Sequence, residues 1–174
     1  GIQTKDIGRI EKVLGDKKDF KFKDLDSNID LNITVTNLTT SDYEVWNKNN
    51  KPDMKIIDAI VTSCSIPLFF TPKEVDKYVY CDGGLVKNYN IDYFDTISYN
   101  SILGFRLVND NDYKENKTDN IINYSAAILK TVYNVSNKID NPRFEDVTVN
   151  INTKKYKSFN FDIDMVDKIK LFEI

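Results

Sequence analysis

The sequence predicts an α/β fold, because segments with the 3.6-residue period of a helix alternate along the chain with segments that have the two-residue period of a strand. Its 174 residues are 41% hydrophobic and 29% charged, which is ordinary for one globular domain. No internal repeat, low-complexity linker or break in composition divides the chain. We therefore expect a single domain over residues 1–174.

Three elements are predicted in the first part of the chain. Apolar residues recur at helical spacing over Ile2–Leu14, and Gly15 ends that helix. Ile29–Thr36 alternates apolar and polar residues, as a strand does when one face lies on a core. A second helix has Asp53 as its cap and ends at Pro67. The predicted inner face of this helix consists of Ile56, Ile57, Ile60, Val61 and Cys64.

The alternation continues in the second half of the chain. Ser101–Val108 and Val147–Ile151 have strand patterns, and the segment between them, Thr118–Ile139, has the pattern of a long helix. A last helix is expected near Phe161. The residues of the long helix that are predicted to face inward are Ile121, Ile122, Ile128, Leu129, Val132 and Val135.

The charge and cysteine content exclude several classes of protein. The 24 basic and 27 acidic side chains are mixed along the chain, so no basic stripe indicates a nucleic acid partner. Cys64 and Cys81 are too few for a disulfide framework, which favours a reducing compartment. The sequence shows no signal peptide, and its longest apolar run, Ile66–Phe70, is far shorter than the roughly 18 residues of a membrane-spanning helix. We expect a cytoplasmic protein that contacts membranes at most peripherally.

The chain contains no histidine, which restricts the chemistry it can carry. Ser-His-Asp and Cys-His mechanisms need an imidazole to accept a proton, and zinc sites commonly need one as a ligand. The best acidic cluster, Asn109–Asp112, lacks the glycine and the glutamate that a calcium loop of the EF-hand type requires at its sixth and twelfth positions. We therefore expect that segment to be a solvated loop, and we predict no metal site and no cofactor.

A short strand pattern, Lys77–Cys81, follows a charged turn after Pro72 and ends in Asp82-Gly83-Gly84. Asp and Gly are common where φ is positive, so the tripeptide alone is explained by a tight turn. The catalytic alternative is an aspartate at the tip of a strand, behind which two glycines let the backbone turn sharply. The surrounding sequence decides between these interpretations.

A longer pattern surrounds this motif. Asp58–Pro72 reads DAIVTSCSIPLFFTP, and Tyr78–Gly84, which reads YVYCDGG, is followed by Asn88. Leu31–Leu38 and Thr39–Trp46 precede these segments. The whole pattern resembles the patatin-like phospholipases, in which a strand, a helix of the form A-I-x-A-S-x-S-I-P, a following F-x-P and a strand ending in D-G-G-x-x-x-N occur in this order.

The resemblance implies a three-layer patatin-like fold, with a central sheet flanked by helices, that is incomplete in this chain. It also implies a serine-aspartate dyad, in which Asp82 takes the serine proton directly, with Gly83, Gly84 and Asn88 supporting the motif. The family often has proline two residues after this asparagine, where the chain has Asn90. The implied activity is that of a lipid acyl hydrolase acting on phospholipids or other acyl lipids at a membrane surface.

The family's serine lies in a G-x-S-x-G elbow and its oxyanion donors in a glycine-rich loop, both before the strand at Ile29. Neither motif occurs among these residues, whose six glycines cannot form them. We therefore expect the chain to be the C-terminal portion of a patatin-like domain, inactive on its own, with the nucleophile on an upstream segment of the same protein. The alternatives are a non-catalytic patatin-like module that binds lipid or protein, and an unrelated α/β domain.

Other reactive residues have structural interpretations. Ser63 and Ser65 lie at the end of a helix before a proline, where serine commonly caps or packs. Cys64 and Cys81 are predicted core residues, because no imidazole or basic cluster is present to lower their pKa. The apolar segments predicted to lie in the core, although they could also line an acyl-chain groove, are Leu68–Phe70 and Tyr78–Tyr80.

Overall fold

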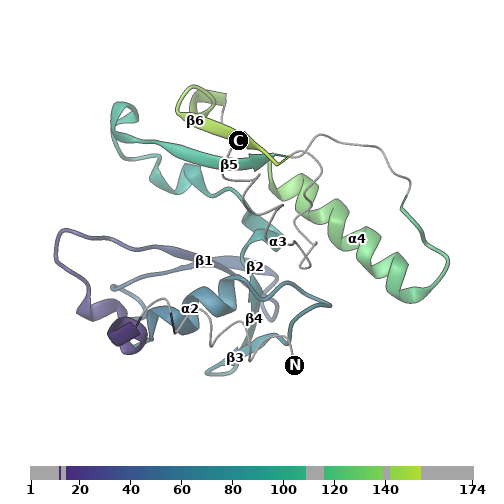
Figure 1. Cartoon of the computed structure of the whole chain (residues 1–174), viewed down its shortest axis with the longest axis horizontal. Helices are drawn as coiled ribbons and strands as arrows, with labels where there is room; N and C mark the ends of the chain where they lie inside the picture. Colours follow the sequence, from purple (N-terminus) through teal and green to yellow (C-terminus); the bar gives the residue numbers. More distant parts are fainter. Residues whose placement is uncertain (1–11, 13–14, 109–115, 139–141, 154–174) are drawn as a thin grey trace. The chain divides into compact units, whose positions relative to one another are not determined.

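The computed structural model of the protein describes residues 12, 15–108, 116–138 and 142–153 (Figure 1). Its helices are interspersed with its strands along the chain, which confirms the predicted α/β class. Contacts divide the chain into two compact units, the first containing residues 1–90 and 117–138 and the second 91–116 and 139–174. The single domain over residues 1–174 stays a prediction. Three predicted segments lie outside the described residues, namely the helix over 2–14 apart from Lys12, the loop over 109–112 and the helix near Phe161.

The first unit is built on a four-stranded antiparallel sheet of order β2-β1-β4-β3. Its strands are β1 Ile33–Asn37, β2 Asp42–Trp46, β3 Lys73–Val75 and β4 Tyr78–Asp82. The prediction that the first strand begins at Ile29 is wrong. Ile29 is exposed, and its N–H donates to the Asp26 carbonyl 2.9 Å away in a turn. The alternation of apolar and polar residues therefore begins before the strand itself.

Helix α2, Ile56–Ser63, packs against β1 and β4. Asp53 does not cap it as predicted, because its carboxylate pairs with the Lys23 ammonium at 2.7 Å and the residue before the helix is Lys55. The helix also ends at Ser63, before the predicted Pro67. The core of this unit is formed by Phe22, Ile33, Val35, Trp46, Ala59 and Tyr80. Two short 3-10 helices, Gly15–Asp19 and Phe22–Asp24, precede the sheet.

The two cysteines differ in burial. Cys81 is buried in β4, as predicted, whereas Cys64 is exposed, so its predicted core position is wrong. Leu68 and Phe69 are also exposed, since the chain turns outward after α2 and Leu68 adopts a positive φ of 71°. The charged segment after Pro72, predicted as a turn, forms β3 and a tight turn into β4.

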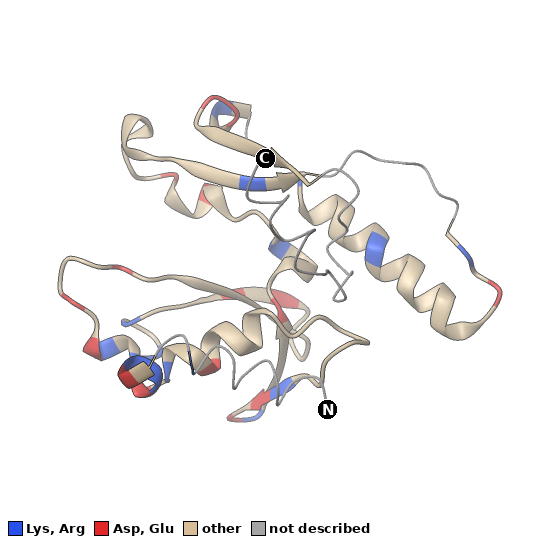
Figure 2. Cartoon of the chain, viewed as in Figure 1, with Lys and Arg blue, Asp and Glu red and all other residues tan. Residues whose placement is uncertain are grey.

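Helix α4, Ile121–Ser136, is capped by the Asn120 side chain, which accepts a hydrogen bond from the Asn123 N–H at 2.9 Å. Of the predicted inner face, only Leu129 is buried, and Ile121 and Ile122 are each 74% exposed. The exposed members of the predicted inner face also include Ile128, Val132 and Val135. The prediction fails because α4 is held against the short helix α3, Gly84–Lys87, by hydrogen bonds at its C-terminal end. Figure 2 shows acidic and basic residues interspersed along the described chain, and α4 carries a single charged residue, Lys130.

The second unit contains a parallel pair of strands, β5 Gly104–Val108 and β6 Thr148–Asn152. Both strands were predicted. The predicted start, Ser101, lies three residues before the observed start of β5, and the predicted start, Val147, lies one residue before that of β6. The unit's 3-10 helices are Ile91–Phe94, Tyr99–Ser101 and Pro142–Phe144. Phe144 and Ile91 are its buried apolar residues among those described. None of the described helices has the length and apolar character needed to span a membrane.

Candidate active site

Asp82 is the last residue of β4, and its position is fixed by two neighbouring segments. On one side it lies opposite Val35 of β1. On the other, its backbone N–H donates to the Ser65 carbonyl at 3.0 Å, and the next N–H, of Gly83, donates to the Ser63 carbonyl at 3.3 Å. The end of the strand is therefore held both by the sheet and by the segment that follows α2.

The Asp82 carboxylate is partly buried and accepts a hydrogen bond from the Gly84 N–H, whose nitrogen lies 2.7 Å from Oδ1. Burial raises the pKa of this carboxyl, and the nearby Tyr133 side chain and the Gly84 amide only partly offset that rise. A carboxylate with a raised pKa is a stronger base than an exposed aspartate. The arrangement can therefore accept a proton from a hydroxyl group.

Gly83 is required for space rather than for an unusual backbone conformation. Its φ of −63° and ψ of −30° are helical, so the positive φ expected of a tight Asp-Gly-Gly turn does not occur here. A Cβ at this position would run into the backbone carbonyl of Thr34 in β1. Ser63 Oγ donates to that same carbonyl at 2.7 Å. The absence of a side chain at Gly83 lets β1 pass directly behind the Asp82 motif.

Gly84 provides space for the functional groups themselves. A Cβ there would lie 2.6 Å from Asn88 Oδ1, 2.8 Å from Asp82 Oδ1 and 2.9 Å from Tyr133 Cε1. Real Cβ atoms essentially never show contacts this short. The carboxylate, the amide and the phenol ring therefore converge on the place that a side chain of residue 84 would occupy.

Asn88 connects the motif to α4. It is exposed, its Nδ2 donates to Asn137 Oδ1 at 3.1 Å, and its backbone N–H donates to the Ser136 carbonyl at 3.3 Å. Ser136 Oγ in turn donates to the Gly84 carbonyl at 2.6 Å. Asn90, at the position where the family often has proline, donates from Nδ2 to Thr34 Oγ1 at 3.1 Å. The motif is thus tied to a helix some fifty residues later in the sequence.

The serines near Asp82 have local partners. Ser63 Oγ donates to the Thr34 carbonyl, and Ser65, which is 2% exposed, donates to the Val61 carbonyl at 2.6 Å. Cys81 directly precedes Asp82 in β4. Burial, together with the charge of Asp82, raises the pKa of the Cys81 thiol to about 12, so this thiol is protonated at neutral pH. Among the described residues, no three Cys, Asp or Glu side chains gather as metal ligands.

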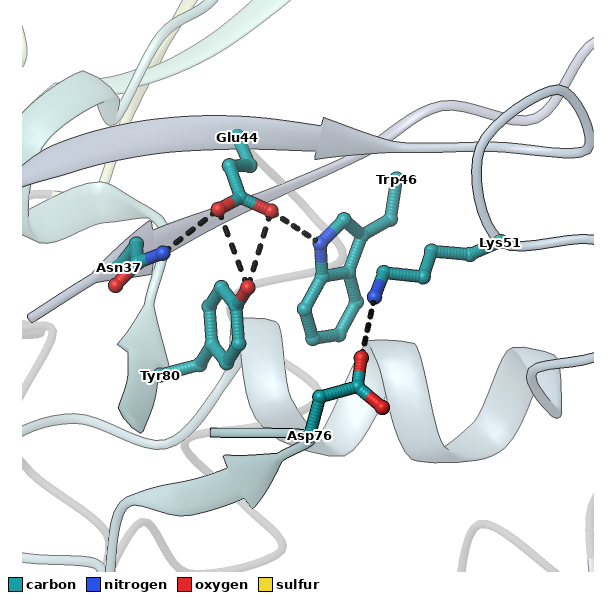
Figure 3. A network of polar contacts seen from close by, with 6 residues as sticks. All are labelled: Asn37, Glu44, Trp46, Lys51, Asp76 and Tyr80. Carbon is teal, nitrogen blue, oxygen red and sulfur yellow. Dashed lines mark hydrogen bonds and ion pairs between the residues drawn. The ribbon is translucent and has the colours of Figure 1, made fainter. Parts of the chain in front are cut away.

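A second polar cluster lies in the same sheet around Glu44 of β2 (Figure 3). The Glu44 carboxylate accepts hydrogen bonds from Asn37 Nδ2 at 2.7 Å, from Trp46 Nε1 at 3.0 Å and from the Tyr80 hydroxyl at 3.1 and 3.2 Å. Although burial alone would raise the pKa of Glu44, these donors and the nearby Lys51 hold it below its ordinary value. Glu44 therefore remains ionised and joins β1, β2 and β4.

Sequence reasoning does not single out Tyr133 or Glu44. Tyr133 lies 51 positions after Asp82, in a helix whose apolar pattern predicts a different inner face. A signal was present in Leu129, Tyr133 and Ser136, which are spaced four and three residues apart and so share one side of a helix. Glu44 could have been suspected as an acid in a segment of strand-forming residues, two places before Trp46 and therefore on the same face of the strand as this aromatic side chain.

The chain is similar to known proteins over most of its length. Residues 5–95, more than half of the chain and including the whole of β4 and the Asp-Gly-Gly motif, match the family model described as patatin-like phospholipase. An uncharacterized protein of Acanthamoeba polyphaga mimivirus is 29% identical over 175 residues, which cover 94% of this chain and 58% of that relative. The chain thus spans little more than half the length of that relative. It belongs to the patatin-like phospholipase family.

Proposed function

We propose that the protein is a lipid acyl hydrolase, which cleaves carboxylic ester bonds of phospholipids or other acyl lipids by a serine-aspartate dyad. Asp82 is the general base, and the serine lies outside these 174 residues, on an upstream segment of the same protein. One observation carries the proposal: a partly buried carboxylate with a raised pKa, oriented by the Gly84 N–H at the end of β4. The membership of the chain in the family supports it.

In this proposal Asp82 transfers protons in both halves of the reaction. It takes the proton of the serine hydroxyl while the serine oxygen attacks the ester carbonyl carbon, and it then gives that proton to the departing alcohol. In the second half Asp82 takes a proton from water while the water oxygen attacks the carbonyl carbon of the acyl-serine ester, and it then gives that proton to the serine oxygen as the fatty acid departs. Because the chain has no histidine, no imidazole of these residues takes part. The oxyanion donors, like the serine, lie on the upstream segment.

The test is ester hydrolysis by the full-length protein and its Asp82→Asn variant. Asparagine keeps the shape and still accepts the Gly84 N–H, but it cannot accept a proton from serine. We expect kcat to fall by a factor on the order of 10²–10⁴, the usual contribution of a positioned base. Circular dichroism checks that both proteins are folded.

Asp42→Asn is a matched control. Asp42 is an exposed strand aspartate whose Oδ1 also accepts a backbone N–H, that of Tyr43 at 2.8 Å, so the same substitution there should leave the rate unchanged. Equal rates for wild type and Asp82→Asn would show that Asp82 only shapes a turn. A folded wild-type protein that binds lipid vesicles but hydrolyses no ester would instead favour a non-catalytic lipid-binding module.

A further inference from the structure

We propose that Tyr133 of α4 is a positioning residue for Asp82, whose hydroxyl fixes the carboxylate in the orientation needed for proton transfer. The inference rests on the proposed function, since it gives Tyr133 a role in that reaction. It also makes a separate physical claim, that the phenol and the carboxylate form one hydrogen-bonded unit. The two parts can be tested apart.

The first argument is the convergence of groups at Gly84. A Cβ at this position would meet Asp82 Oδ1 at 2.8 Å and Tyr133 Cε1, the ring carbon next to the one that bears the hydroxyl, at 2.9 Å. The hydroxyl oxygen of Tyr133 is fully buried. A buried phenol beside a partly buried carboxylate is placed to donate its proton to that carboxylate, because leaving either group unsatisfied is costly.

The second argument is the way α4 is attached at this point. Ser136, three residues after Tyr133 and on the same side of the helix, donates to the Gly84 carbonyl at 2.6 Å, and its own carbonyl accepts the Asn88 N–H at 3.3 Å. Asn137 accepts a hydrogen bond from the Asn88 side chain at 3.1 Å. Leu129, four residues before Tyr133, is buried. Contacts on both sides therefore fix the helical turn that carries Tyr133 against the Asp82 motif.

The third argument is electrostatic. The titratable groups that face Asp82 are Tyr133 from α4, Cys81 on β4 and Cys64 after α2. Burial, followed by the charge of Asp82, holds the pKa of Tyr133 far above its ordinary value, so the phenol keeps its proton throughout the working pH range. It therefore acts as a donor. Together with the Gly84 N–H, it gives the carboxylate two donors from two different elements.

The experiment compares full-length wild type with Tyr133→Phe, which removes the hydroxyl and keeps the ring. The first readout needs no turnover: carbon-13 NMR of protein labelled at its aspartate carboxyl carbons, with the Asp82 signal identified by its absence in Asp82→Asn. A donated hydrogen bond lowers the pKa of Asp82, so its titration midpoint should rise in Tyr133→Phe. The second readout is kcat/KM against pH, whose acid limb should move to higher pH while kcat falls about tenfold.

Tyr124→Phe is the matched control, because Tyr124 lies on the same helix and is 52% exposed. It should change neither readout. An unchanged Asp82 midpoint in folded Tyr133→Phe overturns the proposal. If that variant does not fold, Ser136→Ala, which loosens α4 at Gly84, should raise the midpoint in the same direction, and no change there overturns the proposal equally. If the midpoint moves but the wild type hydrolyses no ester, the pairing of Tyr133 with Asp82 is supported and the proposed function fails.

Discussion

Two carboxylates lie in one row of the sheet, on either side of the same residue. Val35 of β1 is opposite Glu44 of β2 and also opposite Asp82 of β4. Both acids are partly buried, yet the pKa of Glu44 is lowered and that of Asp82 is raised. Asp82 is the more deeply buried of the two carboxylates, and the hydrogen-bond donors around the two acids also differ.

The hydrogen-bond donors around Glu44 and Asp82 differ in number and in kind. Glu44 receives hydrogen bonds from three side chains, those of Asn37, Trp46 and Tyr80, which offset the cost of burying its charge. Asp82 has the Gly84 N–H and Tyr133, which do not fully offset burial. Under the proposed function, the carboxylate with the larger set of donors holds the sheet together, and the one with fewer donors accepts a proton. The predictions below test this distinction.

The largest effect on stability is expected from Glu44→Ala. This change leaves the buried donors of Asn37, Trp46 and Tyr80 without their acceptor, and each unsatisfied donor costs roughly 1 kcal/mol or more. We expect a loss of about 3 kcal/mol in the free energy of unfolding, measured by urea denaturation of the full-length protein. Glu74→Ala, on exposed β3, is the control and should change stability by less than about 0.5 kcal/mol. Equal losses in both variants would mean that the Glu44 cluster does not stabilise the sheet.

A smaller loss of stability is expected from Gly84→Ala, which disturbs the surroundings of Asp82. The added methyl group would contact Asp82 Oδ1, Asn88 Oδ1 and the Tyr133 ring at distances below 3 Å, so at least one of them must move. Overpacking of this kind costs about 1–3 kcal/mol. Because the carboxylate is one of the three groups that the methyl group would contact, we expect hydrolysis by the folded variant to fall about 10²-fold. A variant with normal stability and rate would show that the groups around Gly84 adapt freely.

Local patterns in the sequence predicted much of this architecture. β4 and the Asp-Gly-Gly motif were predicted nearly residue by residue, because a strand of β-branched and aromatic residues that ends in Asp-Gly-Gly is a local signal. Helix α2 and strands β5 and β6 were also predicted from local signals, namely the helical or strand periodicity of their residues. The boundaries failed where long-range contacts decide them, as at Asp53, whose carboxylate is drawn to Lys23 instead of capping a helix.

The candidate site was predicted only in its local part. Asp82 could be proposed from its motif, but the role of its glycines could not, because the Thr34 carbonyl that excludes a side chain at Gly83 comes from a strand nearly fifty residues earlier. The inner face of α4 was misjudged because hydrophobicity favoured Ile121 and Ile122, while the helix is held through the polar Ser136 and its neighbours. Hydrophobicity alone therefore does not show which face of a helix is held by polar contacts with a distant segment.

The smallest effect distinguishes the two carboxylates by its sign. Because burial raises the pKa of Asp82 in the folded protein, ionisation of this carboxyl lowers the stability of the native state at pH values above the folded pKa. This loss is absent below the unfolded pKa of about 3.9, where the carboxyl is protonated in both states. Asp82→Asn should therefore be as stable as wild type or up to about 1 kcal/mol more stable at pH 7, with the difference vanishing near pH 3. Glu44→Gln should show the opposite sign, because the lowered pKa of Glu44 gives stability above about pH 4.3 that is lost as the pH falls through the folded pKa. Urea midpoints of the three full-length proteins between pH 3 and pH 7 measure both trends. A loss of stability at pH 7 in Asp82→Asn comparable to that of Glu44→Gln would mean that Asp82, too, is a structural anion, and the contrast between the two sites would be wrong.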